Sequence, residues 1–222
     1  MTAGWTKIDD YIADHLVPAD DAAARALDAS AAAGLPAIAV SPPQGKMLTL
    51  LARMARARRI LEIGTLGGYS TIWLARALPP EGRVVTLEID PHHADVARAN
   101  IAAAGWGQHV DIRVGPALDT LGAMAAAGEA TFDFIFVDAS KAESADYLRA
   151  VLPLSHPGTV LLFDNVVRAG AVGEPGGGDA VAGIRALFEA VAADSGLSAT
   201  AIQTVGEKGW DGFLLAIVEQ RP

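Results

Sequence analysis

The sequence has no cysteine, which excludes disulfide bonds, thiolate metal sites and a cysteine nucleophile. Positive charge is also scarce, because 17 Lys and Arg residues stand against 26 Asp and Glu residues, for a formal net charge of −9. Since no basic cluster stands out along the chain, we expect no nucleic-acid partner. The 222 residues are 51% hydrophobic and 19% charged, a composition typical of a globular chain rather than a disordered one.

Long uncharged apolar runs are missing as well. No run reaches the roughly 18 residues that a membrane-spanning helix needs, so we expect no membrane segment. The first residues, MTAGWTKIDDYIADHL, are polar and acidic, and they lack the charged start and the apolar core of a signal peptide. Together these absences predict a cytoplasmic protein.

The start of the chain predicts a helical region. Residues 6–33 have helical periodicity, with an interruption expected at Pro18. The candidate buried positions of this segment are Ile8, Tyr11, Ile12, Leu16 and Leu27. A Gly/Pro/Ser connection, GLPAIAVSPPQG, leads into a second helical pattern, KMLTLLARMARA. The length fits one large domain, so we predict a single domain over residues 1–222, with residues 1–40 as a helical region for substrate or dimer contacts.

Beyond this region, apolar runs alternate with alanine-rich helical stretches. The runs are RILEIGT, RVVTLEID, VDIRVG, FDFIFVDAS and TVLLFDNV, and the stretches between them include STIWLARAL, ADVARANIAAAG and SADYLRAVLPL. This alternation predicts crossover units and a parallel sheet whose strands are covered on both faces. The last segment, ATAIQTVGEKGWDGFLLAIVEQ, predicts a hairpin of two strands at the sheet edge. The expected fold class is α/β, with a Rossmann-like, doubly wound, mostly parallel sheet.

The polar residues at the strand ends are candidates for function, because ligands of open α/β sheets bind there. The first strand end carries Gly64, Gly67 and Gly68, which let a ligand approach the backbone; tight packing of strand on helix is the alternative. Their G-x-x-G-G spacing is not the dinucleotide pattern G-x-G-x-x-G. Glu62 beside them suits a cationic amine, and Glu88 at the next strand end suits ribose hydroxyls. A ligand with a ribose and a cationic end, but no pyrophosphate, indicates S-adenosylmethionine.

Two later strand ends predict a cation site. Asp138, Asp164 and Asn165 offer hard oxygen ligands, which suit Mg²⁺, Mn²⁺ or Ca²⁺ and would make a poor zinc site. The alternative is that each aspartate caps the helix that follows it. Lys141, three residues beyond Asp138, is a candidate general base in such a site, and the alternative is a solvated surface lysine.

These segments resemble the cation-dependent O-methyltransferase family that includes the caffeoyl-CoA and catechol O-methyltransferases, and most of all its small bacterial members. The resemblance runs from about Val40 to the C-terminus. LEIGTLGGYSTIWLA resembles the family's cofactor motif E-x-G-x-x-x-G-Y-S, FIFVDASKAESADY resembles its D-A-D-K-x-x-Y segment, and GTVLLFDNVVRAGAV resembles its D-N-V-L-x-x-G segment. The family implies a seven-stranded sheet with an antiparallel last strand, the class I S-adenosylmethionine-dependent methyltransferase fold. Many members are homodimers.

The resemblance also implies a role for each matched residue. The methionine part of the cofactor and the turn around it would be held by Glu62, Gly64, Thr65 and Ser70. Glu88 would bind the ribose hydroxyls, Ala117 would lie by the adenine, and Val40 and Asp138 would also border the cofactor. The cation would be bound by Asp138, Asp164 and Asn165, and Lys141 would be the base. Two residues depart from the family pattern. Ser140 replaces the second Asp of D-A-D-K, and Ala169 replaces a polar residue that plant members use near the substrate.

The implied reaction is methylation of one hydroxyl of a catechol-type aromatic small molecule, with S-adenosylhomocysteine as the second product. A CoA-thioester substrate is not expected, because the N-terminal region does not match the acyl-CoA contacts of the plant enzymes. Three alternatives stay open: an acceptor that is a non-catechol hydroxylated natural-product intermediate, a non-catalytic S-adenosylmethionine-binding protein, and an NAD-dependent oxidoreductase, against which the missing dinucleotide pattern argues. The segment EPGGGD predicts a mobile loop, either a lid over the acceptor or a linker.

Overall fold

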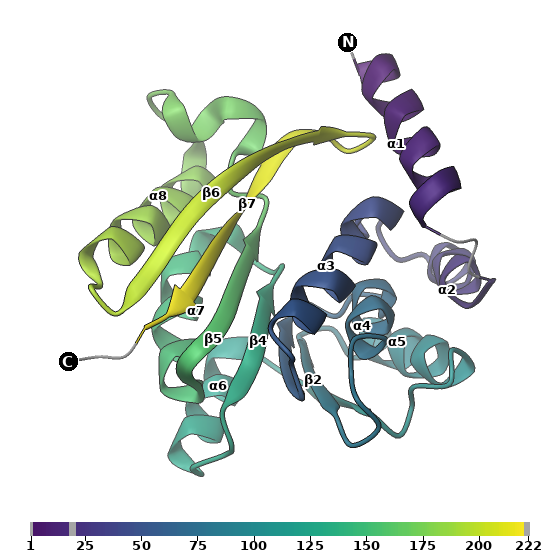
Figure 1. Ribbon diagram of the computed structural model, residues 1–222, viewed down its shortest axis with the longest axis horizontal. Coiled ribbons are helices and arrows are strands. Elements are labelled where there is room, and N and C mark those ends of the chain that lie inside the picture. The colour runs from purple at the N-terminus through teal and green to yellow at the C-terminus, as the bar shows by residue number, and fades with distance from the viewer. Residues whose placement is uncertain (1, 18–20, 220–222) are drawn as a thin grey trace.

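A computed structural model of the protein describes residues 2–17 and 21–219. Its centre is one seven-stranded sheet with the strand order β3-β2-β1-β4-β5-β7-β6 (Figure 1). The strands are β1 (Arg59–Ile63), β2 (Arg83–Glu88), β3 (Val110–Val114), β4 (Phe132–Val137), β5 (Ser155–Asp164), β6 (Leu197–Gly206) and β7 (Gly209–Val218). The first five pair in parallel, whereas β7 runs antiparallel to both β5 and β6. The predicted mostly parallel sheet with a C-terminal hairpin at its edge is confirmed.

Helices cover both faces of this sheet (Figure 1). They are α1 (Thr2–Leu16), α2 (Asp21–Ala32), α3 (Pro42–Met54), α4 (Tyr69–Ala75), α5 (Pro91–Ala103), α6 (Ala117–Ala126), α7 (Ser144–Val151) and α8 (Gly178–Ala193), with short 3₁₀ turns η1 (Lys141–Glu143), η2 (Leu152–Leu154) and η3 (Arg168–Gly173). One apolar cluster joins α6, α7 and α8 to the sheet, and a second joins α3 and α4 to its other face. Among the residues described, none of these helices combines the length and the apolar character needed to cross a bilayer.

The alternation of side chains along the strands decides which residues meet α3 and α4. Leu61 and Ile63 belong to the cluster under α6–α8, so Glu62 between them points to the opposite face. Phe163 likewise belongs to the first cluster, which turns Asp164 toward α3. The acidic residues at the carboxyl ends of β1 and β5 therefore share one face of the sheet, and this shared face positions the candidate site.

The N-terminal region is helical as predicted, but its buried positions differ from the prediction. The helices α1 and α2 are separated where the interruption was expected, and Pro18 itself lies outside the described residues. Four predicted core positions are exposed, namely Ile8 (60%), Tyr11 (62%), Leu16 (67%) and Leu27 (37%). Ala23 and Ala26 of α2 are buried instead. Helical periodicity correctly indicated an apolar face on α1, but this chain does not cover that face.

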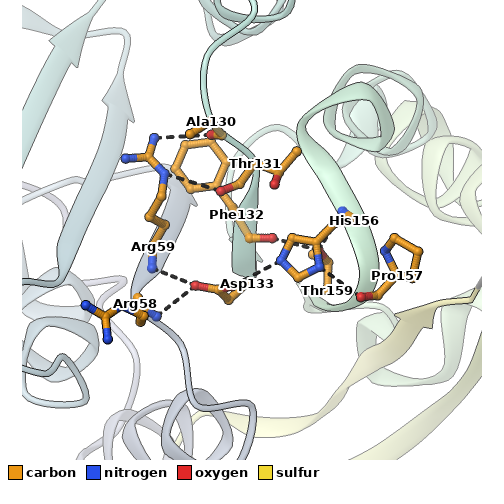
Figure 2. Close-up of polar contacts among 9 residues, drawn as sticks. All are labelled: Arg58, Arg59, Ala130, Thr131, Phe132, Asp133, His156, Pro157 and Thr159. Carbon is orange, nitrogen blue, oxygen red and sulfur yellow. Dashed lines mark hydrogen bonds and ion pairs between the residues drawn. The ribbon is translucent and has the colours of Figure 1, made fainter.

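A polar network ties the strand starts together at the edge opposite the candidate site. Asp133 Oδ2 accepts the backbone N–H groups of Arg58 and Arg59 at 2.8 Å each, and its Oδ1 lies 3.0 Å from His156 Nε2 (Figure 2). Burial raises the pKa of Asp133, but the backbone hydrogen bonds and His156 outweigh it, so that the pKa is lowered. The Pro157 carbonyl and Asp133 raise the pKa of His156. The network therefore connects β1, β4 and β5 at their amino ends.

Candidate active site

The carboxyl ends of β1, β4 and β5 form a row. The register pairs Ile63 with Val137 and Val137 with Phe163, so the next residues are Gly64, Asp138 and Asp164 in neighbouring positions. The Asp138 N–H donates to the Ile63 carbonyl at 2.8 Å, which extends the ladder by one step. The strand order also changes direction between β1 and β4, and such switch points are where open α/β sheets bind ligands.

The glycine turn after β1 serves both close approach and tight packing. Gly64 has φ +102°, and a Cβ there would lie 2.2 Å from the Asp138 carbonyl oxygen. Only glycine thus lets the turn after β1 lie against the end of β4. A Cβ on Gly67 would lie 2.1 Å from Ser30 Oγ of α2, so glycine at this position allows the turn to pack tightly against α2.

Glu62 is the buried anchor of the turn. Its carboxylate is fully buried and accepts hydrogen bonds from Ser70 Oγ at 2.6 Å, Thr86 Oγ1 at 2.6 Å and Thr71 Oγ1. Thr65 Oγ1 lies 2.6 Å from Thr86 Oγ1 and extends this chain of hydroxyls. Burial raises the pKa of Glu62 to about 7, although the three hydroxyl donors act against the rise. The structure therefore joins Glu62, Thr65 and Ser70, and their contact with a cofactor stays a prediction.

Glu88 at the end of β2 fixes the middle of the same turn. Its Oε2 accepts the Leu66 N–H at 2.8 Å and its Oε1 accepts the Asp90 N–H at 3.0 Å. Leu66 has φ +49°, a left-handed conformation that a leucine adopts only when its surroundings hold it there. The two remaining predicted cofactor residues lie outside this turn. Val40 is buried in the cluster under α3 and α4, and Ala117 is the first residue of α6.

The predicted cation residues meet beside this turn. Lys141 Nζ lies 2.7 Å from Asp138 Oδ1, and its side chain is only 12% exposed. Asp164 is 5% exposed, and burial together with the charge of Asp138 raises its pKa to about 7. The capping alternative is wrong, because Ser140 and Val167 are the N-cap residues of η1 and η3. The alternative of a solvated Lys141 is wrong as well.

Asn165 completes the set from the position after Asp164. It adopts φ +56°, and its N–H donates to Asp164 Oδ1 at 2.8 Å. Asparagine tolerates this left-handed conformation better than most residues. Within the described part of the chain, its side-chain amide has no hydrogen-bond partner. The candidate ligand set is thus two carboxylates and one amide oxygen. Among the described residues, no three His, Cys, Asp or Glu side chains gather as a metal cluster.

Sequence reasoning missed three contributors to the site. Gln44 Nε2 donates to Asp164 Oδ2 at 2.6 Å, and Thr71 and Thr86 donate to Glu62. A signal existed for Thr86 alone: a hydroxyl inside a buried apolar strand needs a partner. Nothing local connects Gln44 with a residue 120 positions away.

The segment after Asn165 is held from two sides. Asp211 Oδ1 accepts the N–H groups of Val167 and Arg168 at 3.0 Å each, next to Ala169 in a left-handed conformation. The Arg185 guanidinium of α8 donates to four carbonyls, those of Ala171, Val172, Glu174 and Gly176. In the segment EPGGGD, predicted as a mobile loop over residues 174–179, Arg185 therefore holds the carbonyls of Glu174 and Gly176, and Gly178 already begins α8.

Two surface clefts lie away from this edge and contain none of the predicted site residues. One, of about 270 Å³, is lined by Arg98, Ile101, Gly107, Val110, Asp111 and Ile112. The other, of about 470 Å³, brings together four arginines, Arg53, Arg56, Arg58 and Arg76. The fold thus gathers basic residues that did not stand out as a cluster in the sequence, and the absence of a nucleic-acid partner stays a prediction. Arg53 lies in the last turn of α3 and Arg76 is the C-cap residue of α4, and arginine suits the negative end of a helix.

Known proteins match the chain over nearly its whole length. The family model described as O-methyltransferase matches residues 22–216. A catechol O-methyltransferase of Mycobacterium tuberculosis is 52% identical, with 95% of this chain and 94% of that protein covered. An O-methyltransferase of Bacillus cereus, solved with S-adenosylhomocysteine, is 51% identical with a TM-score of 0.97, covering 99% of this chain and 100% of that one.

The O-methyltransferase TomG of Streptomyces achromogenes, involved in tomaymycin synthesis and solved with S-adenosylmethionine, is 49% identical with a TM-score of 0.95. The alignment covers 99% of each chain. The family match over most of the chain and the relatives at this identity exclude the alternative of an NAD-dependent oxidoreductase. The chain therefore belongs to the O-methyltransferase family, which confirms the prediction of an S-adenosylmethionine-dependent O-methyltransferase.

Proposed function

We propose that the protein methylates one hydroxyl of a catechol-type aromatic small molecule, using S-adenosylmethionine and a divalent cation, Mg²⁺ or else Mn²⁺ or Ca²⁺. The observation that carries the proposal is the row of strand ends in which the Asp138–Lys141 pair and Asp164 lie beside the Gly64 turn. The relative of Mycobacterium tuberculosis that bears the name catechol O-methyltransferase supports the acceptor class.

The residues present fit a hard divalent cation. Asp138, Asp164 and Asn165 would supply oxygen ligands, and water or the acceptor would fill the other positions that Mg²⁺ requires. Burial and the neighbouring charge of Asp138 raise the pKa of Asp164, and a bound cation would offset this charge repulsion. When bound, the cation would polarise the acceptor oxygens and orient them, since metals act as Lewis acids and as templates.

The chain's own residues would provide the proton acceptor and the orientation. Lys141 would take the proton of the attacking hydroxyl at Nζ when that amine is deprotonated, and Asp138 Oδ1 at 2.7 Å would then stabilise the cationic amine that forms. Holding the two reactants in line is the larger contribution, because orientation alone can supply about 7–11 kcal/mol. The loop 165–173, held by Asp211 and Arg185, would form one wall around the acceptor.

The cofactor side of the proposal uses the glycine turn. Glu88 already accepts two backbone N–H groups, and a carboxylate has further lone pairs for ribose hydroxyls. Ser70 and Thr65 would border the methionine part, in positions that Glu62 fixes. Val40 and Ala117 would contact the remaining parts of the cofactor.

A second candidate acceptor is a non-catechol hydroxylated natural-product intermediate. TomG, the relative involved in tomaymycin synthesis, favours it at nearly the same identity. Both candidates require methyl transfer to a hydroxyl, so an assay distinguishes them only through the acceptor compounds that are tested. The replacement of Asp by Ser140, which motivates the non-catalytic alternative, lies at the N-cap of η1 and leaves Asp138 and Lys141 paired.

Two variants test the function. Asp138→Ala should abolish Mg²⁺-dependent methylation while the protein stays folded, because the variant removes one ligand and the partner of Lys141. Lys141→Ala should lower kcat more than it raises the dissociation constant of S-adenosylhomocysteine, and it should change the pH–rate profile. Normal turnover of purified Asp138→Ala would contradict the metal assignment, and an unchanged pH–rate profile would contradict the role of Lys141.

The proposal includes a homodimer in the cytoplasm. α1 and the tip of the β6–β7 hairpin lie side by side, where Asp9 Oδ2 accepts the Glu207 N–H at 2.7 Å (Figure 1). Exposed apolar side chains on these elements are Ile8, Tyr11, Leu16, Ile202, Val205 and Trp210. Such a surface supports contact with a second copy. Light scattering should give twice the mass of one chain, and the mass of a single chain would contradict the dimer.

A further inference from the structure

Gln44 in the first turn of α3 makes the contact between that helix and the candidate cation site. Its Nε2 donates to Asp164 Oδ2 at 2.6 Å, and the Asn165 N–H donates to Oδ1 at 2.8 Å. Each oxygen of the Asp164 carboxylate is thus held by one donor. The carboxylate cannot rotate without losing both hydrogen bonds.

The local sequence would also allow the Gln44 side chain to cap the start of α3, but the side chain does not do so in the structure. Ser41, Pro42, Pro43 and Gln44 match the capping box S-x-x-Q, and Ser41 Oγ accepts the Gln44 N–H at 3.4 Å. In a complete capping box the glutamine side chain would return to the serine backbone N–H. Here it crosses to β5 instead, so the start of α3 is capped without the side chain of Gln44.

The packing of α3 makes this crossing possible. A Cβ on Gly45 would lie 2.4 Å from the Trp73 ring, so glycine is required for α3 to approach α4 this closely. The close approach brings the first turn of α3 over the face of the sheet on which Asp164 lies. Gly45 therefore helps to place the neighbouring Gln44 within hydrogen-bond distance of Asp164.

The two aspartates have donors of different charge. Lys141 holds Asp138 with a cationic amine, whereas Gln44 holds Asp164 with a neutral amide. A neutral donor fixes the direction of a carboxylate without cancelling its charge. We propose that Gln44 is a positioning residue for the cation site, which orients Asp164 and leaves its full negative charge for the cation. This inference rests on the proposed function and adds a residue outside its ligand set.

The test compares variants of Gln44 with a matched control. Gln44→Met keeps the length and removes the donor, and Gln44→Ala removes the side chain. Gln108→Met makes the same change at an exposed glutamine outside the site. Calorimetric titration of the metal-free proteins with Mn²⁺ measures cation binding, titration with S-adenosylhomocysteine measures cofactor binding, and thermal unfolding measures stability.

We expect both Gln44 variants to bind Mn²⁺ about 10- to 100-fold more weakly, as is typical when the partner of a metal ligand is removed. Binding of S-adenosylhomocysteine and the behaviour of Gln108→Met should match the wild type. At saturating Mg²⁺, kcat should fall less than the apparent KM for Mg²⁺ rises.

Three results would overturn the inference, and they differ in what else they overturn. If the wild type binds no Mn²⁺, the proposed cation site fails and Gln44 has nothing to position. If the wild type binds Mn²⁺ and both Gln44 variants bind it as tightly, only the positioning role fails. If the variants lose cofactor and Mn²⁺ affinity alike, together with thermal stability, Gln44 has a structural role instead.

Discussion

Replacing Asp164 with asparagine should make the metal-free protein more stable. Burial and the charge of Asp138 raise the pKa of Asp164 from 3.8 to about 7. The folded state therefore holds this proton more tightly than the unfolded state does, and the stability of the wild type falls as pH rises from about 4 to about 7. Asp164→Asn removes the ionisation and hence this loss.

The size of the effect follows from two opposing contributions. A pKa rise from 3.8 to about 7 corresponds to about 4 kcal/mol of lost stability at pH 8. Asparagine has only one acceptor oxygen, so either Gln44 or Asn165 loses its partner, which costs about 1–3 kcal/mol. The net gain is about 1–3 kcal/mol, or roughly 2–12 °C in Tm for a chain of this size.

Thermal unfolding in EDTA at pH 5 and pH 8 measures the gain. The Tm difference between Asp164→Asn and the wild type should be positive at pH 8 and smaller at pH 5. Excess Mg²⁺ should reverse the order, because a ligand at 100 times its Kd stabilises the wild type by about 2.7 kcal/mol and the variant cannot bind it. A variant less stable than the wild type at pH 8 in EDTA would show that the Asp164 charge supports the fold, which refutes the reasoning.

Three further perturbations test other parts of the account. Gly64→Ala should lower Tm by several degrees and weaken Mn²⁺ binding, because its Cβ would lie 2.2 Å from the Asp138 carbonyl; an unchanged Tm would contradict the tight approach. His156→Gln should reduce stability in urea below about pH 6.5 and have less effect at pH 8.5, since the folded pKa is raised and the contribution of the charged ring is lost as pH rises through it; a larger effect at pH 8.5 would contradict this sign. Asp211→Ala should speed hydrogen exchange at the Val167 amide, and unchanged protection there would show that Asp211 does not hold the loop.

The sheet could be predicted because each of its central strands leaves a pattern in its own short stretch of sequence. A strand covered on both faces must be apolar along its length, so runs such as RILEIGT and FDFIFVDAS are visible in the sequence. The glycines after β1 and the carboxylates after β4 and β5 follow such runs directly, and parallel strands bring these ends to one edge. The sequence therefore predicts that the residues which follow these runs, Gly64, Asp138 and Asp164, lie together.

Contacts between distant segments could not be predicted in this way. The helical period of α1 shows that Ile8, Tyr11 and Leu16 share a face, but it cannot show that this chain leaves the face uncovered. The hydrogen bond of Gln44 to Asp164 depends on how closely α3 approaches α4, which Gly45 decides through Trp73. Tertiary packing, rather than any local pattern, determines these features.

The most direct test of the account is methyl transfer in the presence and absence of a cation. The purified protein is incubated with S-adenosylmethionine and a panel of catechols, with either Mg²⁺ or EDTA, and mass spectrometry measures the gain of one methyl group. The account predicts methylated catechol with Mg²⁺ and none with EDTA. Equal methylation in both conditions would contradict the role of Asp138, Asp164 and Asn165 as a cation site.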